Sequence, residues 1–338
     1  MRLLVIERNS YVDPQNLSRS MQERVIAPLK AISNNVQFDI KSEHQQIELK
    51  NYDAVFFSRH KSEKCLEIAI QAAALRKKIF YDLDDWVFEF PKNSISGWSA
   101  RDIERSLEIM RTSTTVITST EFLAHTLRSN QGIESSVVPT GIDFKEFDFN
   151  KKLSHKSNKI VFVNGDNLKL ENFKDVFFKS INSFLETHLS FQLDIYADTY
   201  KALTEISRFN KCGAYPWESF KEVLLEPNYL FGITPLIIDE DDAPSSFYKC
   251  KSPIKYYLFG SLMIPGIYSK SEIYKDVVVD RETGLLVDNT YDAWASAINE
   301  LIHNDKLRQK IAINAFQDVK KKHHVSISAQ KIHSLLSK

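Results

Sequence analysis

The chain has 338 residues, more than one hydrophobic core usually serves, so we expect two domains of about 150 residues each. Apolar residues make up 43% of the chain and charged residues 26%, a balance that is ordinary for a globular protein and excludes a disordered one. Lys and Arg together number 44, as do Asp and Glu, which gives no reason to expect nucleic acid as a partner. The three cysteines are far apart and lack metal-site spacing, which excludes a disulfide framework and suits a reducing cytoplasm.

The first half alternates short β-rich apolar runs with longer segments of helical period. The N-terminal run LLVIE is closed by Glu7 and Arg8, so it is too short for a signal peptide or a membrane span and is predicted to be the first strand. Ser119 or Thr120 is expected to cap a helix that begins at Glu121. This rhythm predicts βαβ units and a parallel sheet. The predicted strands are LLVIE, VQFDI, DAVFFS, KIFYDL, TVITS and SSVVP, and the predicted helices span 18–33, 61–75, 99–111 and 120–129.

A polar stretch, FKEFDFNKKLSHKSNK, follows VVPTGID and is predicted to link two domains. The alternation then resumes, so the fold class is α/β, with two doubly wound domains and ligands expected in the cleft between them. We place an N-terminal domain at 1–150, a C-terminal domain at 151–320, and a C-terminal helix at 321–338 that packs back on the first domain. The later strands are IVFVNG, FQLDIYA, YLFGITPL, LMIPGIYS and GLLV, and the later helices span 170–187, 200–207, 217–225, 252–260, 291–302 and 304–321.

The most informative stretch is KSPIKYYLFGSLMIPGIYS, residues 251–269. Pro253 favours a helix start, with Ser252 as its N-cap and Lys255 in its first turn. A cation there opposes the helix dipole, and a bound diphosphate would resolve the conflict by accepting hydrogen bonds from the backbone N–H groups, the hydroxyl and the ammonium. The alternative is a lysine that points into water.

The order of VVPTGID, FVNGD, FGITPL, SPIKYY, IPGIYS and GLLVDNTYDAWASAINELI resembles retaining glycosyltransferases of the GT-B fold, the group 1 family. The resemblance covers most of the chain and is weak in the first 80 residues. It implies two Rossmann-like domains that face each other, an N-terminal one for the acceptor and a C-terminal one for the donor. It also implies that Ser252 and Lys255 bind the diphosphate of a nucleotide sugar, that Asn164 and Gly165 approach the same phosphates, and that Lys169 serves as the basic residue of that loop.

Two departures from the family pattern affect the donor site. Cys250 and Leu258 stand where many members carry two glutamates eight residues apart, and Met263 replaces a usual glycine. Neither the Cys250 nor the Leu258 side chain binds a ribose as a carboxylate does. The ribose contacts would therefore come from Tyr256, from Tyr257 or from the acidic loop IDEDDAPSS. The departures leave open a homologue that has lost catalysis.

Three aspartates, Asp82, Asp84 and Asp85, crowd the end of a predicted buried strand in YDLDDWVFEFP. In a GT-A enzyme such a D-x-D motif would hold a divalent cation, but no phosphate-binding loop is found in the first half. In the GT-B interpretation these carboxylates contact the acceptor or the transferred sugar, and one of them is a candidate base. The remaining alternative is that they cap a turn.

Other candidates lie beside the aspartates. Arg59 and His60 follow the third strand and reach the same edge of the sheet, and Trp86 is a candidate platform for a sugar ring. The alternative for Trp86 is that its ring packs inside the protein and contacts no sugar.

The expected function is that of a retaining, metal-independent glycosyltransferase that moves a sugar from a nucleoside diphosphate sugar to a hydroxyl of a glycan or lipid-linked saccharide. We expect no cofactor, no nucleic-acid partner and a cytoplasmic location, with peripheral contact at the inner face of the cell membrane. The resemblance suggests polysaccharide biosynthesis for the cell envelope. Two alternatives remain open, a catalytically silent GT-B homologue and a metal-dependent GT-A enzyme that uses Asp82 and Asp84.

Overall fold

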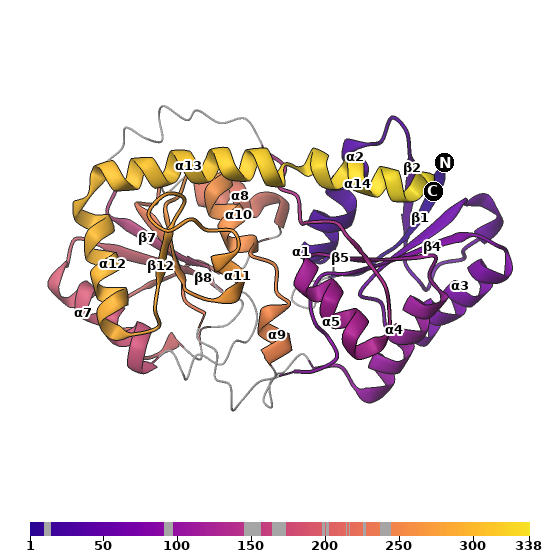
Figure 1. The fold of residues 1–338 in the computed structure, drawn as a ribbon, viewed down its shortest axis with the longest axis horizontal. Coiled ribbons are helices and arrows are strands. Elements are labelled where there is room, and N and C mark those ends of the chain that lie inside the picture. Colours follow the sequence, from indigo (N-terminus) through magenta and orange to yellow (C-terminus); the bar gives the residue numbers. More distant parts are fainter. Residues whose placement is uncertain are drawn as a thin grey trace.

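The computed structural model describes residues 1–9, 15–90, 97–144, 157–163, 174–197, 200, 203–213, 215, 217–225, 228–236 and 245–338. Within these ranges, each half of the chain is built around a six-stranded parallel sheet with helices packed against it (Figure 1). The two doubly wound units that the strand–helix alternation predicts are therefore confirmed.

The first sheet has the strand order β2-β1-β3-β4-β5-β6, and each neighbouring pair is parallel. Its central strands are apolar over most of their length because helices cover both faces of the sheet. The polar residue at the carboxyl end of β4, Asp82, therefore needs a partner inside the protein. The strands are β1 (Arg2–Ile6), β2 (Gln37–Lys41), β3 (Ala54–Ser58), β4 (Lys78–Leu83), β5 (Thr115–Thr118) and β6 (Ser136–Val137).

The helices of the first half begin at side-chain caps that the sequence supplies. The Ser62 side chain accepts a hydrogen bond from the backbone of Cys65, Ser99 and Asp102 form a capping box, and Thr120 caps the following helix. Of the two residues predicted for that last cap, Thr120 is the one used. The helices are α1 (Arg19–Met21), η1 (Gln22–Ile26), α2 (Ala27–Ala31), η2 (Leu49–Asn51), α3 (Glu63–Ala74), α4 (Ala100–Thr112) and α5 (Glu121–Gln131).

The segment predicted as one helix at 18–33 is divided. Its middle, η1, is a π-helical turn between two α-helical ends. Such turns are rare in proteins, and those that occur are often found at functional sites. Here the turn buries two charged residues, Glu23 and Arg24.

The second sheet has the strand order β12-β11-β10-β7-β8-β9, again parallel throughout. The helix predicted at 200–207 is not formed in its described part, 203–207, whereas β9, α9 and α11 were not predicted. The strands are β7 (Lys159–Val163), β8 (Gln192–Tyr196), β9 (Asn210–Lys211), β10 (Phe231–Thr234), β11 (Gly266–Ser269) and β12 (Leu285–Val287). The helices are η4 (Lys174–Phe178), α7 (Lys179–Thr187), α8 (Trp217–Leu225), α9 (Ser245–Lys249), α10 (Ile254–Ser261), α11 (Glu272–Lys275), α12 (Tyr291–His303), α13 (Asp305–His323) and α14 (Val325–Ser337).

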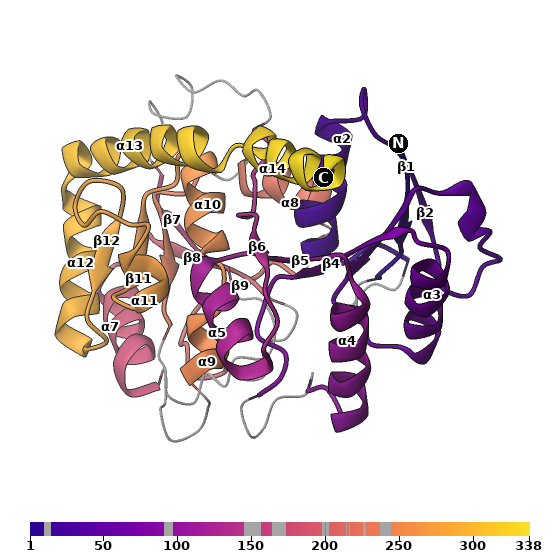
Figure 2. The same cartoon turned by 45° about the vertical axis from the view of Figure 1, so that its right-hand side comes forward.

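The last two helices join the halves of the molecule. Figures 1 and 2 show α13 running along the second sheet and α14 continuing over the first, where it lies beside α2. Ile332 and Leu336 of α14 are buried in the same apolar cluster as Leu3 and Val5 of β1. The end of the described chain is therefore part of the first core.

A second connection is made by α9, which packs against α5. The ring of Phe247 lies 5.7 Å from that of Phe90, and Cys250 is buried in the core of the first sheet. These contacts hold the segment before α10 against the first half, which places the start of α10 opposite the end of β4.

Candidate active site

A cavity of about 330 Å³ lies between the two halves, and both contribute to its walls. Asp84, Asp85 and Thr140 line it from the first half, and Ser252 and Lys255 from the second. Residues that the sequence places some 170 positions apart are thus brought together, as expected where the carboxyl ends of parallel strands face a cleft. We call this cavity the cleft.

The start of α10 forms one wall of the cleft. The residue before the helix is Pro253, and no side chain caps the helix, so the prediction that Ser252 is the N-cap is wrong by one position. The Ser252 hydroxyl instead lies 3.5 Å from Thr140 Oγ1 of the first half, at the limit of a hydrogen bond. The first N–H groups of the helix and this hydroxyl are therefore available to an anion in the cleft.

Lys255 also lines the cleft and is half-buried. Burial lowers the pKa of its ammonium from the ordinary 10.5 to about 8, and the neighbouring Lys251 adds to the effect. None of the ion pairs formed among the described residues includes Lys255. A partly desolvated cation at a helix start is unfavourable unless an anion binds there.

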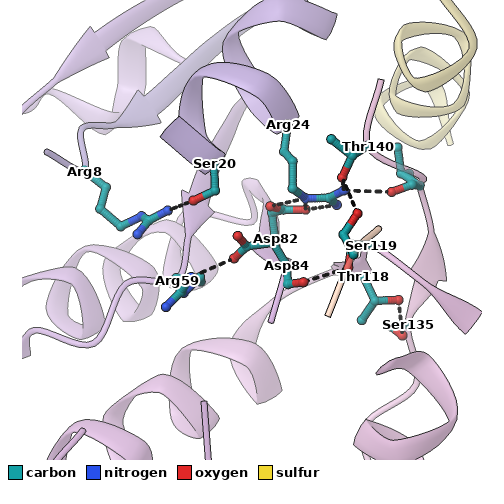
Figure 3. A network of polar contacts seen from close by, with 12 residues as sticks. Arg8, Ser20, Arg24, Arg59, Asp82, Asp84, Thr118, Ser119, Ser135 and Thr140 are labelled. Carbon is teal, nitrogen blue, oxygen red and sulfur yellow. Dashed lines mark hydrogen bonds and ion pairs between the residues drawn. The ribbon is translucent and has the colours of Figure 1, made fainter. Parts of the chain in front are cut away.

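Asp82, in contrast, has a partner in the protein. Its carboxylate is 1% exposed and accepts hydrogen bonds from Arg24 Nε at 3.0 and 3.1 Å (Figure 3). Arg24 also donates to the Val138 carbonyl at 3.0 Å and to Thr140 Oγ1 at 3.2 Å. Asp82 does not line the cleft, so the prediction that it contacts the acceptor or acts as a base is wrong: the carboxylate neutralises a buried guanidinium.

Asp84 and Asp85 do reach the cleft. Arg59 Nη1 donates to Asp84 Oδ1 at 3.3 Å (Figure 3). The same nitrogen lies 3.7 Å from Asp85 Oδ2. Burial raises the pKa of Asp84, but Arg59, Arg8 and Arg24 outweigh it and hold the pKa below its ordinary value. Asp84 is thus a charged acceptor of hydrogen bonds at the cleft, and Arg59 positions it.

Asp85 extends the polar wall across the two halves, because its Oδ2 lies 3.9 Å from Lys251 Nζ of the second half. The predicted roles of Asp84, Asp85, Arg59, Ser252 and Lys255 stay predictions, but the structure gathers these residues at one place.

Two neighbours of the aspartates are packing residues. His60 Nδ1 accepts a hydrogen bond from the backbone of Ser58 at 2.9 Å and Nε2 donates to the Glu7 carbonyl at 3.0 Å, while burial lowers the pKa of the ring to about 4. Trp86 is 1% exposed and packs edge-on against Phe88. The predictions that His60 and Trp86 contact a sugar are therefore wrong, since neither side chain has a free face.

The tyrosines predicted to contact a ribose do not line the cleft. The Tyr256 hydroxyl donates to Asp318 Oδ2 at 2.7 Å, and the Tyr257 ring stacks on His323 with centroids 3.9 Å apart. Both partners belong to α13, on the opposite side of α10, so this prediction is wrong as well. Asn164, Gly165, Lys169 and residues 238–244 of the acidic loop lie outside the described residues.

The sequence interpretation missed Glu23, which lines the cleft although it is only 8% exposed. Burial raises the pKa of its carboxyl to about 8, against the opposing effect of Lys221. It also missed Arg24, the partner of Asp82. A signal was present, because Glu23 and Arg24 interrupt a segment in which Met21, Val25 and Leu29 mark a buried helix face, but periodicity alone assigns such charges to solvent.

The described residues hold no group of three or more His, Cys, Asp or Glu side chains arranged as a metal site. In the same part of the chain, no helix combines the length and the apolar character that crossing a lipid bilayer requires.

Residues 261–318 match the family model for glycosyl transferases group 1. The chain has no match among curated proteins. Solved structures with a similar fold include HepE from Anabaena, with a TM-score of 0.70 and 12% identity over 100% of this chain and 99% of that one. Sucrose-phosphate synthase from Thermosynechococcus elongatus has a TM-score of 0.68 and 11% identity, over 100% of this chain and 98% of that one. A putative UDP-N-acetylglucosamine 2-epimerase from Listeria monocytogenes has a TM-score of 0.59 and 10% identity, over 99% of this chain and 95% of that one.

At such identities these structures establish the fold, which is GT-B as predicted, and the GT-A alternative is wrong. The protein described as a putative epimerase has a similar fold, so the fold alone does not distinguish these activities. The match to the family model runs from the end of α10 into α13 and covers the strands β11 and β12. The sequence match to the group 1 glycosyl transferases is thus confined to residues 261–318, whereas the GT-B fold extends over the whole chain.

Proposed function

We propose that the chain is a retaining, metal-independent glycosyltransferase that moves a sugar from a nucleoside diphosphate sugar to a hydroxyl of a glycan or lipid-linked saccharide. The observation that carries the proposal is Lys255, a half-buried cation beside the uncapped start of α10. A diphosphate bound there would accept hydrogen bonds from the helix N–H groups, from the Ser252 hydroxyl and from the Lys255 ammonium.

The same groups supply what bond cleavage requires. When the bond between the anomeric carbon and the phosphate oxygen breaks, negative charge develops on the diphosphate, and Lys255 and the helix start stabilise it without a metal ion. The acceptor hydroxyl forms the new bond on the face from which the diphosphate departs, so the configuration is retained. The departing phosphate oxygen takes the hydroxyl proton, and the products are a nucleoside diphosphate and a glycoside.

The opposite wall of the cleft binds sugar. The Asp84 carboxylate, held by Arg59, accepts hydrogen bonds from hydroxyls of the transferred sugar or of the acceptor. We assign Asp85 the same kind of contact, and its proximity to Lys251 couples it to the donor half. We assign neither residue the role of a base, because the departing phosphate takes the proton.

The chemistry of this site calls for no cofactor. A cytoplasmic setting, peripheral contact with the inner face of the cell membrane and a role in cell-envelope polysaccharide synthesis belong to the proposal through the family resemblance. HepE, one of the proteins of similar fold, was solved with UDP and glucose, and UDP is therefore the first nucleotide to test.

A catalytically silent homologue is the second candidate. Cys250 is buried in the core of the first sheet, and Leu258 forms an apolar part of the cleft wall. A donor bound without the usual glutamates would lack their ribose contacts, so binding and turnover have to be measured separately.

The binding test is saturation-transfer NMR with UDP, GDP, ADP, dTDP and CMP, with and without EDTA. We expect one diphosphate to bind equally well in EDTA. Its signal should be strongly weakened in Lys255→Ala but kept in Lys306→Ala, which replaces an exposed lysine on α13. Binding that needs Mg²⁺ or Mn²⁺ would contradict metal independence. Binding that Lys255→Ala leaves unchanged would refute the donor site.

The catalytic test follows the anomeric proton by NMR while the identified nucleotide sugar is incubated with saccharide acceptors. An axial product from an axial donor supports retention, and an equatorial product refutes it. Tight binding of the nucleotide sugar without transfer or hydrolysis would favour the silent homologue.

A further inference from the structure

A second cavity, of about 430 Å³, lies beside the cleft. Its described walls come from η1 and α2, from the segment 141–143 that follows β6, from Lys221 of α8 and from Val325 at the start of α14. Glu23 is the residue that lines both cavities, so the second cavity adjoins the place where transfer is proposed.

Two buried polar side chains on η1 face this cavity without a hydrogen-bond partner among the described residues. Gln22 donates through its amide nitrogen to the Leu17 carbonyl at 2.9 Å, but its Oε1 accepts no hydrogen bond. Glu23 is 8% exposed, and its carboxyl takes part in none of the hydrogen bonds or ion pairs found between described residues. A buried polar atom without a partner is costly, so Gln22 Oε1, with the Glu23 carboxyl on the adjacent residue, indicates a ligand that supplies hydrogen bonds.

The protonation state of Glu23 indicates which class of ligand would bind there. The groups that act on its carboxyl are Lys221 of α8, Asp84 after β4, and Arg19 and Arg24 of its own helical segment, but burial outweighs the three cations and raises its pKa to about 8. The carboxyl is therefore mostly protonated at neutral pH and both donates and accepts a hydrogen bond. The Gln22 amide oxygen and a protonated Glu23 carboxyl together suit a neutral hydroxyl better than an ion.

The remaining described walls combine apolar residues with three charged ones, Lys30, Asp143 and Lys221. Ile26, Ala27 and Val325 are apolar, and a pyranose ring presents C–H groups on its faces and hydroxyls at its edge. Of the charged groups at this cavity, Lys221 Nζ donates to the Asp143 carbonyl at 2.7 Å. A volume of this size lies within the range of pockets that hold small organic ligands.

We propose that the second cavity is a saccharide subsite, in which Gln22 and Glu23 bind hydroxyls of a neutral sugar unit of the acceptor. Only the identification of this sugar as part of the acceptor rests on the proposed function. The cavity and its two polar groups would bind a neutral sugar whatever the donor is. Glu23, at the wall shared with the cleft, positions that sugar unit toward the donor.

The test is saturation-transfer NMR with methyl glycosides of glucose, galactose, mannose and N-acetylglucosamine, recorded with UDP present. Ala31 lines the second cavity and not the cleft, and its side chain is exposed, so Ala31→Trp blocks the cavity without disturbing a core. Ala73→Trp, on the exposed face of α3, is the matched control. We expect at least one glycoside to bind the natural protein and Ala73→Trp, and to lose affinity by about fivefold or more in Ala31→Trp.

Variants of Glu23 test the chemistry. Glu23→Ala should lose the glycoside signal, and Glu23→Gln, which keeps a neutral donor and acceptor, should restore most of it. The UDP signal should be the same in Ala31→Trp and Ala73→Trp, whose substituted residues lie outside the cleft.

Failure of the subsite and failure of the proposed function give different results. If UDP does not bind while a glycoside binds and is blocked by Ala31→Trp, the donor proposal fails and the subsite stands. If UDP binds but no glycoside does, or if Ala31→Trp leaves the glycoside signal unchanged, the subsite proposal is overturned. Inorganic phosphate that binds the natural protein and is blocked by Ala31→Trp would overturn the choice of a neutral ligand.

Discussion

The ammonium of Lys255 makes donor binding depend on pH. In the free protein burial holds its pKa at about 8, and an anion bound beside it favours the charged form and raises that pKa. Below pH 8 the lysine is already charged, so the affinity for UDP should not change on its account. Above pH 8 binding must take up a proton, and the affinity should fall by up to about tenfold per pH unit. Calorimetric titration of UDP between pH 6.5 and 9 measures the slope.

Lys255→Arg is the matched control, because a guanidinium stays charged over that whole range. Its affinity for UDP should be flat with pH, as should the weaker affinity of Lys255→Ala. A slope in Lys255→Ala equal to that of the natural protein would assign the titration to another group and contradict the proposed role.

The Arg24–Asp82 pair should matter for stability more than its exposed counterparts. Both side chains are at most 3% exposed, so removing one partner leaves a buried charge without compensation. Arg24→Ala and Asp82→Ala should each lower the free energy of unfolding by about 3–5 kcal/mol. Urea denaturation measures the loss.

A double variant separates the attraction from the cost of burial. Arg24→Met combined with Asp82→Leu removes both charges and fills similar volume, so it should be less destabilised than either single variant. The exposed pair Lys64–Glu67 is the comparison, and Glu67→Ala should cost no more than about 1 kcal/mol. Equal losses at the buried and exposed pairs would show that burial does not make the Arg24–Asp82 pair more important for stability.

At the scale of elements, α14 contributes to the core of the first half although the second half precedes it in the chain. Leu336 is 2% exposed in the cluster that includes Leu3 and Val5. Leu336→Ala should therefore lower the free energy of unfolding by about 3 kcal/mol, whereas Gln330→Ala, on the exposed face of the same helix, should stay within about 0.5 kcal/mol. Thermal unfolding of the two variants decides, and similar melting temperatures would show that α14 is not part of that core.

At the scale of the whole molecule, periodicity predicted what local patterns determine. Strands such as KIFYDL and helices such as 120–129 were recognisable because their apolar residues repeat at the period of the element. The same patterns predicted two sheets and a cleft. They failed at short elements such as α9 and α11, and at η1, where a π-helical turn leaves no mark in the period.

The candidate site was predictable only where a residue's role depends on its own helix or strand. Lys255 follows a proline at a helix start, and the local sequence shows it. Asp82 and Asp84 are two positions apart on the same strand end, yet one faces Arg24 and the other the cleft. That difference, like the contact of Tyr256 with Asp318, depends on segments distant in sequence, and no local pattern encodes it.

The connections between the halves predict how the molecule unfolds. Through α14 and the segment of α9 and Cys250, the second half contributes side chains to the core and surface of the first. Neither sheet should therefore melt alone, and differential scanning calorimetry should give one cooperative transition. The double variant Ile332→Ala, Leu336→Ala loosens α14 and should split that transition, with the first half melting at the lower temperature. UDP, which is proposed to bind chiefly to Ser252 and Lys255 of the second half, should then raise the upper transition and leave the lower one almost unchanged. Two transitions already present in the natural protein would show that these connections are too weak to join the halves, and a single transition in the double variant would show that α9 alone holds them together.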